Sequence, residues 1–280
     1  MEKLHLTMWV KTIAIVVFMV MQSTSSAWNR VGHATIAKIA ENHLTKKAKK
    51  EITSFLDGSS IVRIASFADD YKPEVKVDIG FDPVEGKRII PYPHTFEADA
   101  KTFEAFRGIN KDGHYVKNCV HFIEKYAKEL KERNNKLSKE EIALRIKLIV
   151  HFVGDMHCPE HIRYYPDDMT IGYYNVTIAG KKIRYHTLWD GEMLTNKHPW
   201  GFQEIAYLID TYTEEQIKQI TEGTPYDWAR DSASASWPIH SVKENDVLKK
   251  SFYLKWQGLT ESQVCKAGYR LAKVLNDIFK

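Results

Sequence analysis

The chain has 280 residues, 44% of them hydrophobic and 27% charged, with a formal net charge of +4 at pH 7. This size and apolar content suit one folded domain with a real core, and no low-complexity tract or Pro/Gly/Ser-rich linker divides the chain. The charge is too small for a dedicated duplex-DNA-binding protein. Three scattered cysteines, Cys119, Cys158 and Cys265, exclude a disulfide framework and allow at most one bridge. Because their spacing does not resemble a thiolate site, any bound metal is expected on histidine and carboxylate ligands.

Residues 1–27 have the features of a secretory signal peptide. Two lysines flank the polar start, residues 12–21 form an apolar core, and residues 25–27 are small, as a cleavage site requires. The apolar run is well short of the roughly 20 residues of a transmembrane helix, so an N-terminal anchor is the weaker alternative. Cleavage after Ala27 is predicted to leave one domain, residues 28–280, that is secreted or periplasmic and not stably anchored in a membrane.

Helical periodicity dominates the rest of the chain and predicts an all-α, mostly helical fold. Apolar residues recur at helical spacing in four segments, 34–40, 61–65, 120–126 and 142–153. Ser138 with Glu141 has the capping-box spacing that is expected to start the last of these helices. Only residues 173–189 have the pattern of strands, with Gly180 at the turn, and they predict a small β-hairpin.

The densest chemistry lies in the sequence HFVGDMHCPEH. His151 and Asp155 are four residues apart, so on a helix they project from one face about one turn apart, as two ligands of a common metal must. His161 follows beyond Pro159, where the chain is free to turn. It is therefore placed to offer a nitrogen to a second metal.

Further histidines and aspartates occur in short motifs on both sides of this segment. Downstream, HTLWD repeats the four-residue offset in His186 and Asp190; upstream, FADD provides Asp69 and Asp70, and PYPHTF provides His94. A single His-x-x-x-Asp pair on a helix is more often hydrogen-bonded or salt-bridged than metal-bound. Two such pairs in one chain favour a metal site, which requires these separated motifs to converge in the fold.

Trp28 would become the first residue after cleavage. Its new amine and its carbonyl group, together with the imidazole of His33, are then a plausible set of metal ligands. The alternative is that Trp28 is an aromatic plug for the core. The remaining histidines lack carboxylates at useful spacing or favour a structural role, and they are His43, His114, His121, His157, His198 and His240.

The order of these motifs resembles the zinc-dependent, single-strand-preferring nucleases typified by mung bean nuclease and its fungal and bacterial relatives, in the phospholipase C / nuclease superfamily. The resemblance rests on Trp28-x4-His33, FADD, His94, HFVGDMHCPEH and HTLWD. It extends to YDWARDS (residues 226–232) and AGYRLAKVLN (residues 267–276), and so over essentially the whole mature chain. It implies a mostly helical, monomeric domain with three zinc ions in one cleft.

The resemblance also assigns ligands, position by position. One zinc would be bound by Asp69, His94, His151 and Asp155; a second by Trp28 and His33, with Asp155 as the bridge; and a third by His161, His186 and Asp190. Asp69 is preferred to Asp70 because it directly follows the Phe-Ala pair.

Zinc on such ligands suits hydrolysis, because a pair of ions can lower the pKa of a bridging water toward about 7. The hydroxide would attack phosphorus, Asp69 would orient or deprotonate the water, and the third zinc would stabilise the leaving oxygen. The resemblance implies cleavage of single-stranded DNA and RNA to 5′-phosphorylated nucleotides. It also implies 3′-nucleotidase activity.

Two departures from the family pattern concern the substrate. Lys72 stands where relatives usually carry arginine, so a predicted catalytic phosphate contact there becomes a point charge. The GGN element of many relatives is replaced by GYYNV, which retains Asn175. Tyr174 and Asn175 are the preferred candidates for base contact, ahead of Tyr173 and two phenylalanines. Asn175 also begins an N-glycosylation sequon.

Two other functions stay open. A zinc-dependent phospholipase C has a similar trinuclear site with an N-terminal tryptophan. Its late motif, however, ends in glutamate where Asp190 stands here, and its first histidine lies farther from the N-terminus than His33 does. A secreted zinc-binding protein without catalysis would need no water-orienting carboxylate.

Overall fold

The structure is a computed structural model that describes residues 28–71, 75–82, 86–91, 93–109, 115–116, 118–132, 136–166 and 171–280. The predicted signal peptide, residues 1–27, lies outside the described residues, as do Lys72 and His114. Among the described helices, none combines the length and the apolar character needed to cross a membrane.

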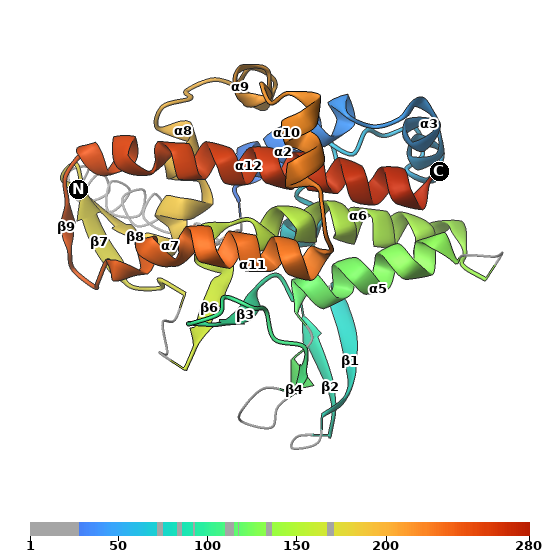
Figure 1. Ribbon diagram of the computed structural model, residues 1–280, viewed down its shortest axis with the longest axis horizontal. Coiled ribbons are helices and arrows are strands. Elements are labelled where there is room, and N and C mark those ends of the chain that lie inside the picture. Colours follow the sequence, from blue (N-terminus) through green and yellow to red (C-terminus); the bar gives the residue numbers. More distant parts are fainter. Residues whose placement is uncertain are drawn as a thin grey trace, which may run out of the picture.

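The fold is mostly helical, as predicted, and long helices form its body (Figure 1). The long helices are α2 (Arg30–Asn42), α3 (Lys46–Phe55), α5 (Cys119–Lys131), α6 (Lys139–Met156), α9 (Phe202–Ile209), α11 (Pro225–Ser236) and α12 (Ser251–Ile278). The shorter helical elements are α4 (Phe67–Asp70), α7 (Tyr185–Thr187), α8 (Met193–Thr195), α10 (Glu214–Ile220), the 3₁₀-helices η1 (Pro159–His161) and η3 (Trp237–Ser241), and the π-helical turn η2 (Leu188–Glu192).

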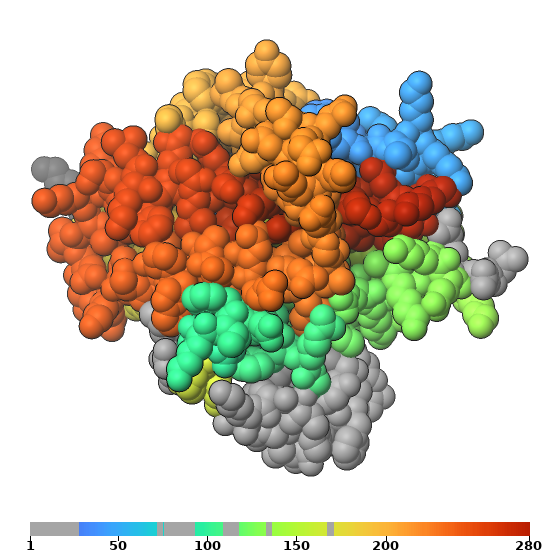
Figure 2. Space-filling model, in the orientation of Figure 1, coloured from blue at the N-terminus to red at the C-terminus, as the bar shows by residue number. Residues whose placement is uncertain are grey.

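The core lies where α12 packs against α2, α5 and α6. The approach of α12 to α2 is close because Gly268 has no side chain: a Cβ there would lie 2.6 Å from Ile39 Cγ2. Helix α6 begins with the predicted capping box, in which Ser138 Oγ accepts from Glu141 N and the Glu141 carboxylate accepts from Ser138 N. In Figure 2, the atoms of α11 and α12, coloured orange to red, cover this face of the helical core.

The strands form small sheets around this helical body. Strand β1 (Lys76–Asp82) pairs with β2 (Gly86–Pro91), β3 (Phe96–Asp99) with β6 (Ile162–Tyr165), and β4 (Gly108–Ile109) with β5 (Tyr115–Val116). Strand β7 (Asn175–Ile178) lies between β8 (Lys181–Arg184) and β9 (Val247–Leu248). The predicted hairpin is β7–β8, and its turn has positive φ at Ala179 and Gly180.

Two sequence predictions about these elements are wrong. Strands are not confined to residues 173–189, and that segment becomes helical from Tyr185 onward. Residues 61–65 form turns and not a helix, because the Ser60 hydroxyl accepts from Val62 N and the Ser60 carbonyl accepts from Arg63 N. The three cysteines are buried and free, so none of them forms a disulfide.

Candidate metal centre

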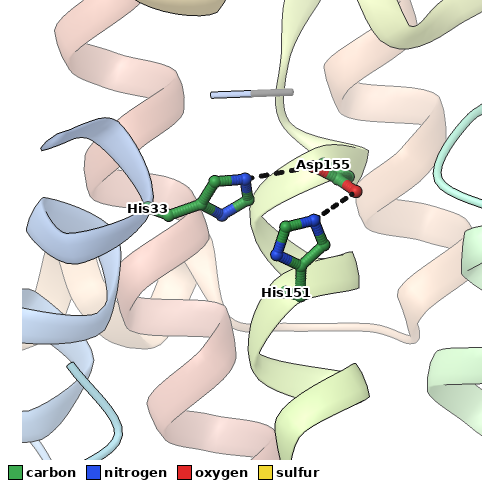
Figure 3. Close-up of side chains that lie close together, drawn as sticks. All are labelled: His33, His151 and Asp155. Carbon is green, nitrogen blue, oxygen red and sulfur yellow. Dashed lines mark ion pairs between the residues drawn. The ribbon is translucent and has the colours of Figure 1, made fainter. Parts of the chain in front are cut away.

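Three of the predicted ligands meet between α2 and α6. His33 on α2 and His151 and Asp155 on α6 point toward one another (Figure 3). His33 Nε2 lies 3.4 Å from Asp155 Oδ1, and His151 Nε2 lies 3.2 Å from Asp155 Oδ2. The two imidazole rings stack with centroids 4.1 Å apart. All three side chains are buried, so the four-residue spacing does place His151 and Asp155 on one face.

Backbone contacts hold these imidazoles in place. His151 Nδ1 lies 2.8 Å from the Ala65 carbonyl oxygen, and donation there leaves Nε2 to face the carboxylates. The His33 ring can pack close to α6 because Gly154 has no side chain: a Cβ there would lie 2.9 Å from His33 Nδ1.

Asp69 enters the same cluster from α4. Its Oδ2 lies 3.8 Å from His33 Nε2 and 3.9 Å from His151 Nε2. The neighbouring Asp70 instead forms an ion pair with the exposed Arg30, at 2.6 Å. The structure thus separates the two aspartates of FADD: Asp69 faces the buried histidines and Asp70 faces the surface.

A second group adjoins the first through His161 on η1. His161 Nδ1 lies 3.8 Å from Asp155 Oδ1, and His161 Nε2 lies 3.7 Å from Asp190 Oδ1 on η2. His186 on α7 stacks on His161 with centroids 5.1 Å apart, and its Nε2 lies 3.4 Å from Asp190 Oδ2. The His94 ring packs edge-on against His161, also at 5.1 Å. The separated motifs of the sequence therefore converge in one place.

Trp28 is buried beside this second group. Asn29, the N-cap of α2, donates its backbone N–H to the Asp190 carbonyl oxygen at 2.5 Å. Its side chain lies against Gly191, where a Cβ would come within 2.1 Å of Asn29 Nδ2. The start of the predicted mature chain is thus fixed to the turn that carries Asp190, while the Trp28 indole fills the core next to Gly32.

Burial and neighbouring charges together set the pKa values of the centre. Burial holds the pKa of His161 well below the ordinary value, so this imidazole is neutral and can offer a lone pair. Burial, reinforced by the Glu160 and Asp155 carboxyl groups, raises the pKa of Asp190 well above its ordinary value. At Asp155 the burial penalty is outweighed by His151, which holds the pKa of that carboxyl well below its usual range. Buried carboxyl groups this close together need a cation or a proton, and a divalent cation would supply the positive charge.

The buried polar atoms fit a metal. Among the described residues, neither ring nitrogen of the fully buried His161 makes a hydrogen bond, and Asp190 Oδ2 also lacks one. Leaving such a group without a partner costs about 1–3 kcal/mol. Tetrahedral zinc with bonds of about 2.0–2.2 Å separates nitrogen and oxygen ligands by roughly 3.4 Å. The observed nitrogen–oxygen separations lie around this value: 3.2 Å at His151–Asp155, 3.4 Å at His33–Asp155 and His186–Asp190, and 3.7 Å at His161–Asp190.

The residues predicted to contact nucleic-acid bases are less clearly placed for that role than the predicted metal ligands are for theirs. The Tyr174 hydroxyl donates to the Val242 carbonyl oxygen at 2.6 Å, and its ring stacks on Tyr185, so packing already occupies this side chain. Asn175 is half-buried at the start of β7. Tyr173, in contrast, is 53% exposed, and its ring centroid lies 5.2 Å from that of His186.

Other histidines have structural partners. His43 contacts Asp210 at 3.0 Å, and His198 contacts Glu261 at 2.7 Å. His157 lies with Nδ1 2.8 Å from the Val153 carbonyl oxygen. These contacts agree with the structural roles that their sequence positions indicate.

Sequence reasoning did not identify Cys158, Glu160 and His240 as neighbours of the centre. Glu160 is buried, accepts the Gly172 N–H at 2.5 Å and lies 3.6 Å from His240 Nδ1. The only signal for Cys158 and Glu160 was their position beside His161 in HCPEH, where neither has the four-residue offset that singled out the aspartates.

Comparison with known proteins identifies the family. The sequence model described as S1/P1 Nuclease matches residues 28–280. The chain is 24% identical over 285 residues to Nuclease P1 of Penicillium citrinum, which covers 90% of this chain and 97% of that protein. It is 22% identical over 280 residues to Endonuclease 2 of Arabidopsis thaliana, with 90% of each covered, and 24% identical over 277 residues to Nuclease S1 of Aspergillus oryzae, with 89% and 91% covered. With its helical fold, its His/Asp centre and a family match over the entire segment from Trp28 to Lys280, the chain belongs to the S1/P1 nuclease family.

Proposed function

We propose that this nuclease is zinc-dependent, cleaves single-stranded DNA and RNA to 5′-phosphorylated products, and also removes 3′-phosphates from nucleotides. The observation that carries the proposal is the meeting of separate histidine and aspartate motifs at Asp155, with buried polar atoms that fit a metal. The sequence relatives, which are named as nucleases, support the substrate class.

The zinc ions would be held by three sets of residues, and the first two share Asp155. These are Asp69, His94, His151 and Asp155; Trp28, His33 and Asp155; and His161, His186 and Asp190. When bound, zinc supplies Lewis acidity and makes water a usable nucleophile near neutral pH. Asp155 suits the role of a shared ligand because its two oxygens face different imidazoles, Oδ1 toward His33 and Oδ2 toward His151.

Asp69 is the proposed catalytic carboxylate. Its Oδ2 faces His33 and His151, so one oxygen can stay on the metal side while the other orients the attacking water and accepts its proton. Lys72, three residues later in the sequence, is the proposed phosphate contact. Its charge can hold a phosphate but cannot form the paired hydrogen bonds of arginine.

Preference for single strands would come from stacking of unpaired bases on exposed rings. Tyr173 is the better-placed platform, because it is half exposed and lies beside His186. Tyr174 and Asn175 remain proposed contacts behind it. The family match begins at Trp28, which supports export with cleavage after Ala27.

The test uses protein that begins at Trp28, assayed on single-stranded DNA, RNA and duplex DNA after chelation and again after zinc is restored. Cleavage of the single strands is expected to be lost and then recovered, with duplex cut more slowly. The variant Asp69→Asn is expected to lose about 10²–10⁴-fold in turnover, while the matched control Asp70→Asn loses only a surface ion pair. Folded, zinc-loaded protein that cuts neither polymer would overturn the proposal. Hydrolysis of phospholipid headgroups by that protein would favour a phospholipase C, and zinc binding with no hydrolysis would favour a binding protein.

A further inference from the structure

Cys158 lies at the junction between α6 and η1, directly beside the second half of the metal centre. The side chain is fully buried, and its Sγ lies 3.7 Å from Asp190 Oδ1. One ligand atom each from Cys158, His161 and Asp190 lie within 4.8 Å of one another. A sulfur, a nitrogen and an oxygen donor thus surround a single buried point.

His161 supports the presence of a metal at this point. It is completely buried, and in the described part of the chain neither of its ring nitrogens makes a hydrogen bond. Its Nε2 lies 3.7 Å from Asp190 Oδ1, the same oxygen that faces the thiol. A buried imidazole without any hydrogen bond is costly unless something else binds its lone pair.

We propose that Cys158 is itself a ligand of the metal held by His161 and Asp190. On binding, the sulfur–metal bond forms and the thiol proton leaves to solvent, since the thiolate is the coordinating species. Tetrahedral zinc with bonds of about 2.3 Å to sulfur and about 2.1 Å to oxygen separates these two ligands by roughly 3.6 Å. The observed 3.7 Å is close to that separation. This inference rests on the metal-binding part of the proposed function.

The consequence is that this metal differs from the other two. The site of Cys158, His161 and Asp190 would include a sulfur donor, which the other two proposed sites lack. A thiolate also makes the site softer, so we expect it to hold a thiophilic ion such as Cd²⁺ more tightly than the all-oxygen-and-nitrogen sites do.

The competing interpretation is that the thiol only donates a weak hydrogen bond to Asp190 Oδ1, for which 3.7 Å is also within reach. Cobalt substitution separates the two, because a cobalt–thiolate bond gives a near-ultraviolet charge-transfer band that a hydrogen bond does not. The probe is Co²⁺ added to chelator-stripped protein that begins at Trp28, with metal content measured for each sample.

The matched control is Cys265→Ala. Cys265 is also buried, but its Sγ contacts the Ile209 carbonyl oxygen on a different part of the fold. Wild type and Cys265→Ala are expected to show the thiolate band with the intensity of one sulfur ligand. Cys158→Ser, which preserves the size of the side chain, is expected to lose it. The wild-type spectrum tests the proposal even if a variant folds poorly.

Cobalt-loaded wild type with no thiolate band would overturn the role of Cys158, as would a band that survives in Cys158→Ser. In both cases bound metal and nuclease activity would leave the proposed function intact. A folded wild-type protein that binds neither cobalt nor zinc would refute the proposed function and this inference together.

Discussion

Gly154 offers a sharp test of how the centre is packed. It lies on α6, one residue before Asp155, and an added Cβ would meet His33 Nδ1 at 2.9 Å and His33 Cε1 at 3.1 Å. Ordinary contacts of a Cβ begin near 3.4 Å, so Gly154→Ala requires the imidazole to retreat by about 0.5 Å. Gly258 on α12 is the matched control, because an added Cβ there meets nothing within 4 Å.

The expected effects on stability and on metal binding have different sizes. Alanine in place of a helical glycine stabilises by about 0.5–1 kcal/mol, and an imidazole pushed off its rotamer costs about 0.5–1.5 kcal/mol. These terms nearly cancel, so the free energy of unfolding of apo Gly154→Ala should change by less than about 1 kcal/mol. Metal–ligand distances, in contrast, tolerate only about 0.2 Å. The ion that depends on His33 should be lost, and turnover should fall about 10²-fold.

The assay measures zinc per chain, turnover on single-stranded DNA and chelator-stripped stability in urea for wild type, Gly154→Ala and Gly258→Ala. Gly258→Ala should retain its zinc and its activity. If Gly154→Ala also retains full zinc content and activity, the close approach to His33 does not position this ligand and the reasoning is wrong.

Two predictions concern the network behind α6. Arg270 is buried and donates to His157 Nε2, the Ile220 carbonyl oxygen and Asp231 Oδ2 at 2.8–2.9 Å. Arg270→Met leaves the buried His157 Nε2 and the partly buried Ile220 carbonyl oxygen without this donor, and it should lower the free energy of unfolding in urea by about 3 kcal/mol. A loss below about 1 kcal/mol would contradict this account. At Asp231, burial raises the pKa, but hydrogen bonds from Lys266 and Arg270 outweigh it and lower the pKa below 3.8. This carboxylate therefore stabilises the fold above about pH 4, and the contribution is lost as pH falls through the lowered pKa. The stability difference between wild type and Asp231→Asn should be constant from about pH 5 to 7, modest because the side chain is 38% exposed, and should shrink toward pH 3. A difference that grows on acidification would refute the sign.

The helices of the core were predictable because their signals are local. Apolar spacing identified α2, α5 and α6, and the Ser138–Glu141 pair located the start of α6 before any tertiary contact was known. The small sheets were not predictable in the same way. Strand β3 pairs in parallel with β6, far along the chain, so its register depends on how the helices bring Phe96 beside Ile162.

The site residues also divide into those placed by local signals and those placed by contacts between distant segments. The proximity of His151 to Asp155 and of His186 to Asp190 could be predicted from the sequence, because a helix or helical turn places residues four apart on the same face. The separation of Asp69 from Asp70 depends on Arg30, which lies on another helix and draws Asp70 to the surface. Such a choice becomes visible only when the chain is folded.

The two ends of the centre are joined by the first residues of the predicted mature chain. Asn29 caps α2, which carries His33, and the same residue donates its backbone N–H to the carbonyl of Asp190 at 2.5 Å. Gly191 allows this contact, since any side chain there would collide with the Asn29 amide. Asn29 is therefore held by contacts with both η2 and α2, one residue after Trp28. If the chain is cleaved after Ala27 as predicted, the new terminus would lie one residue before this anchored Asn29, so less backbone entropy would be lost when its amine binds a metal.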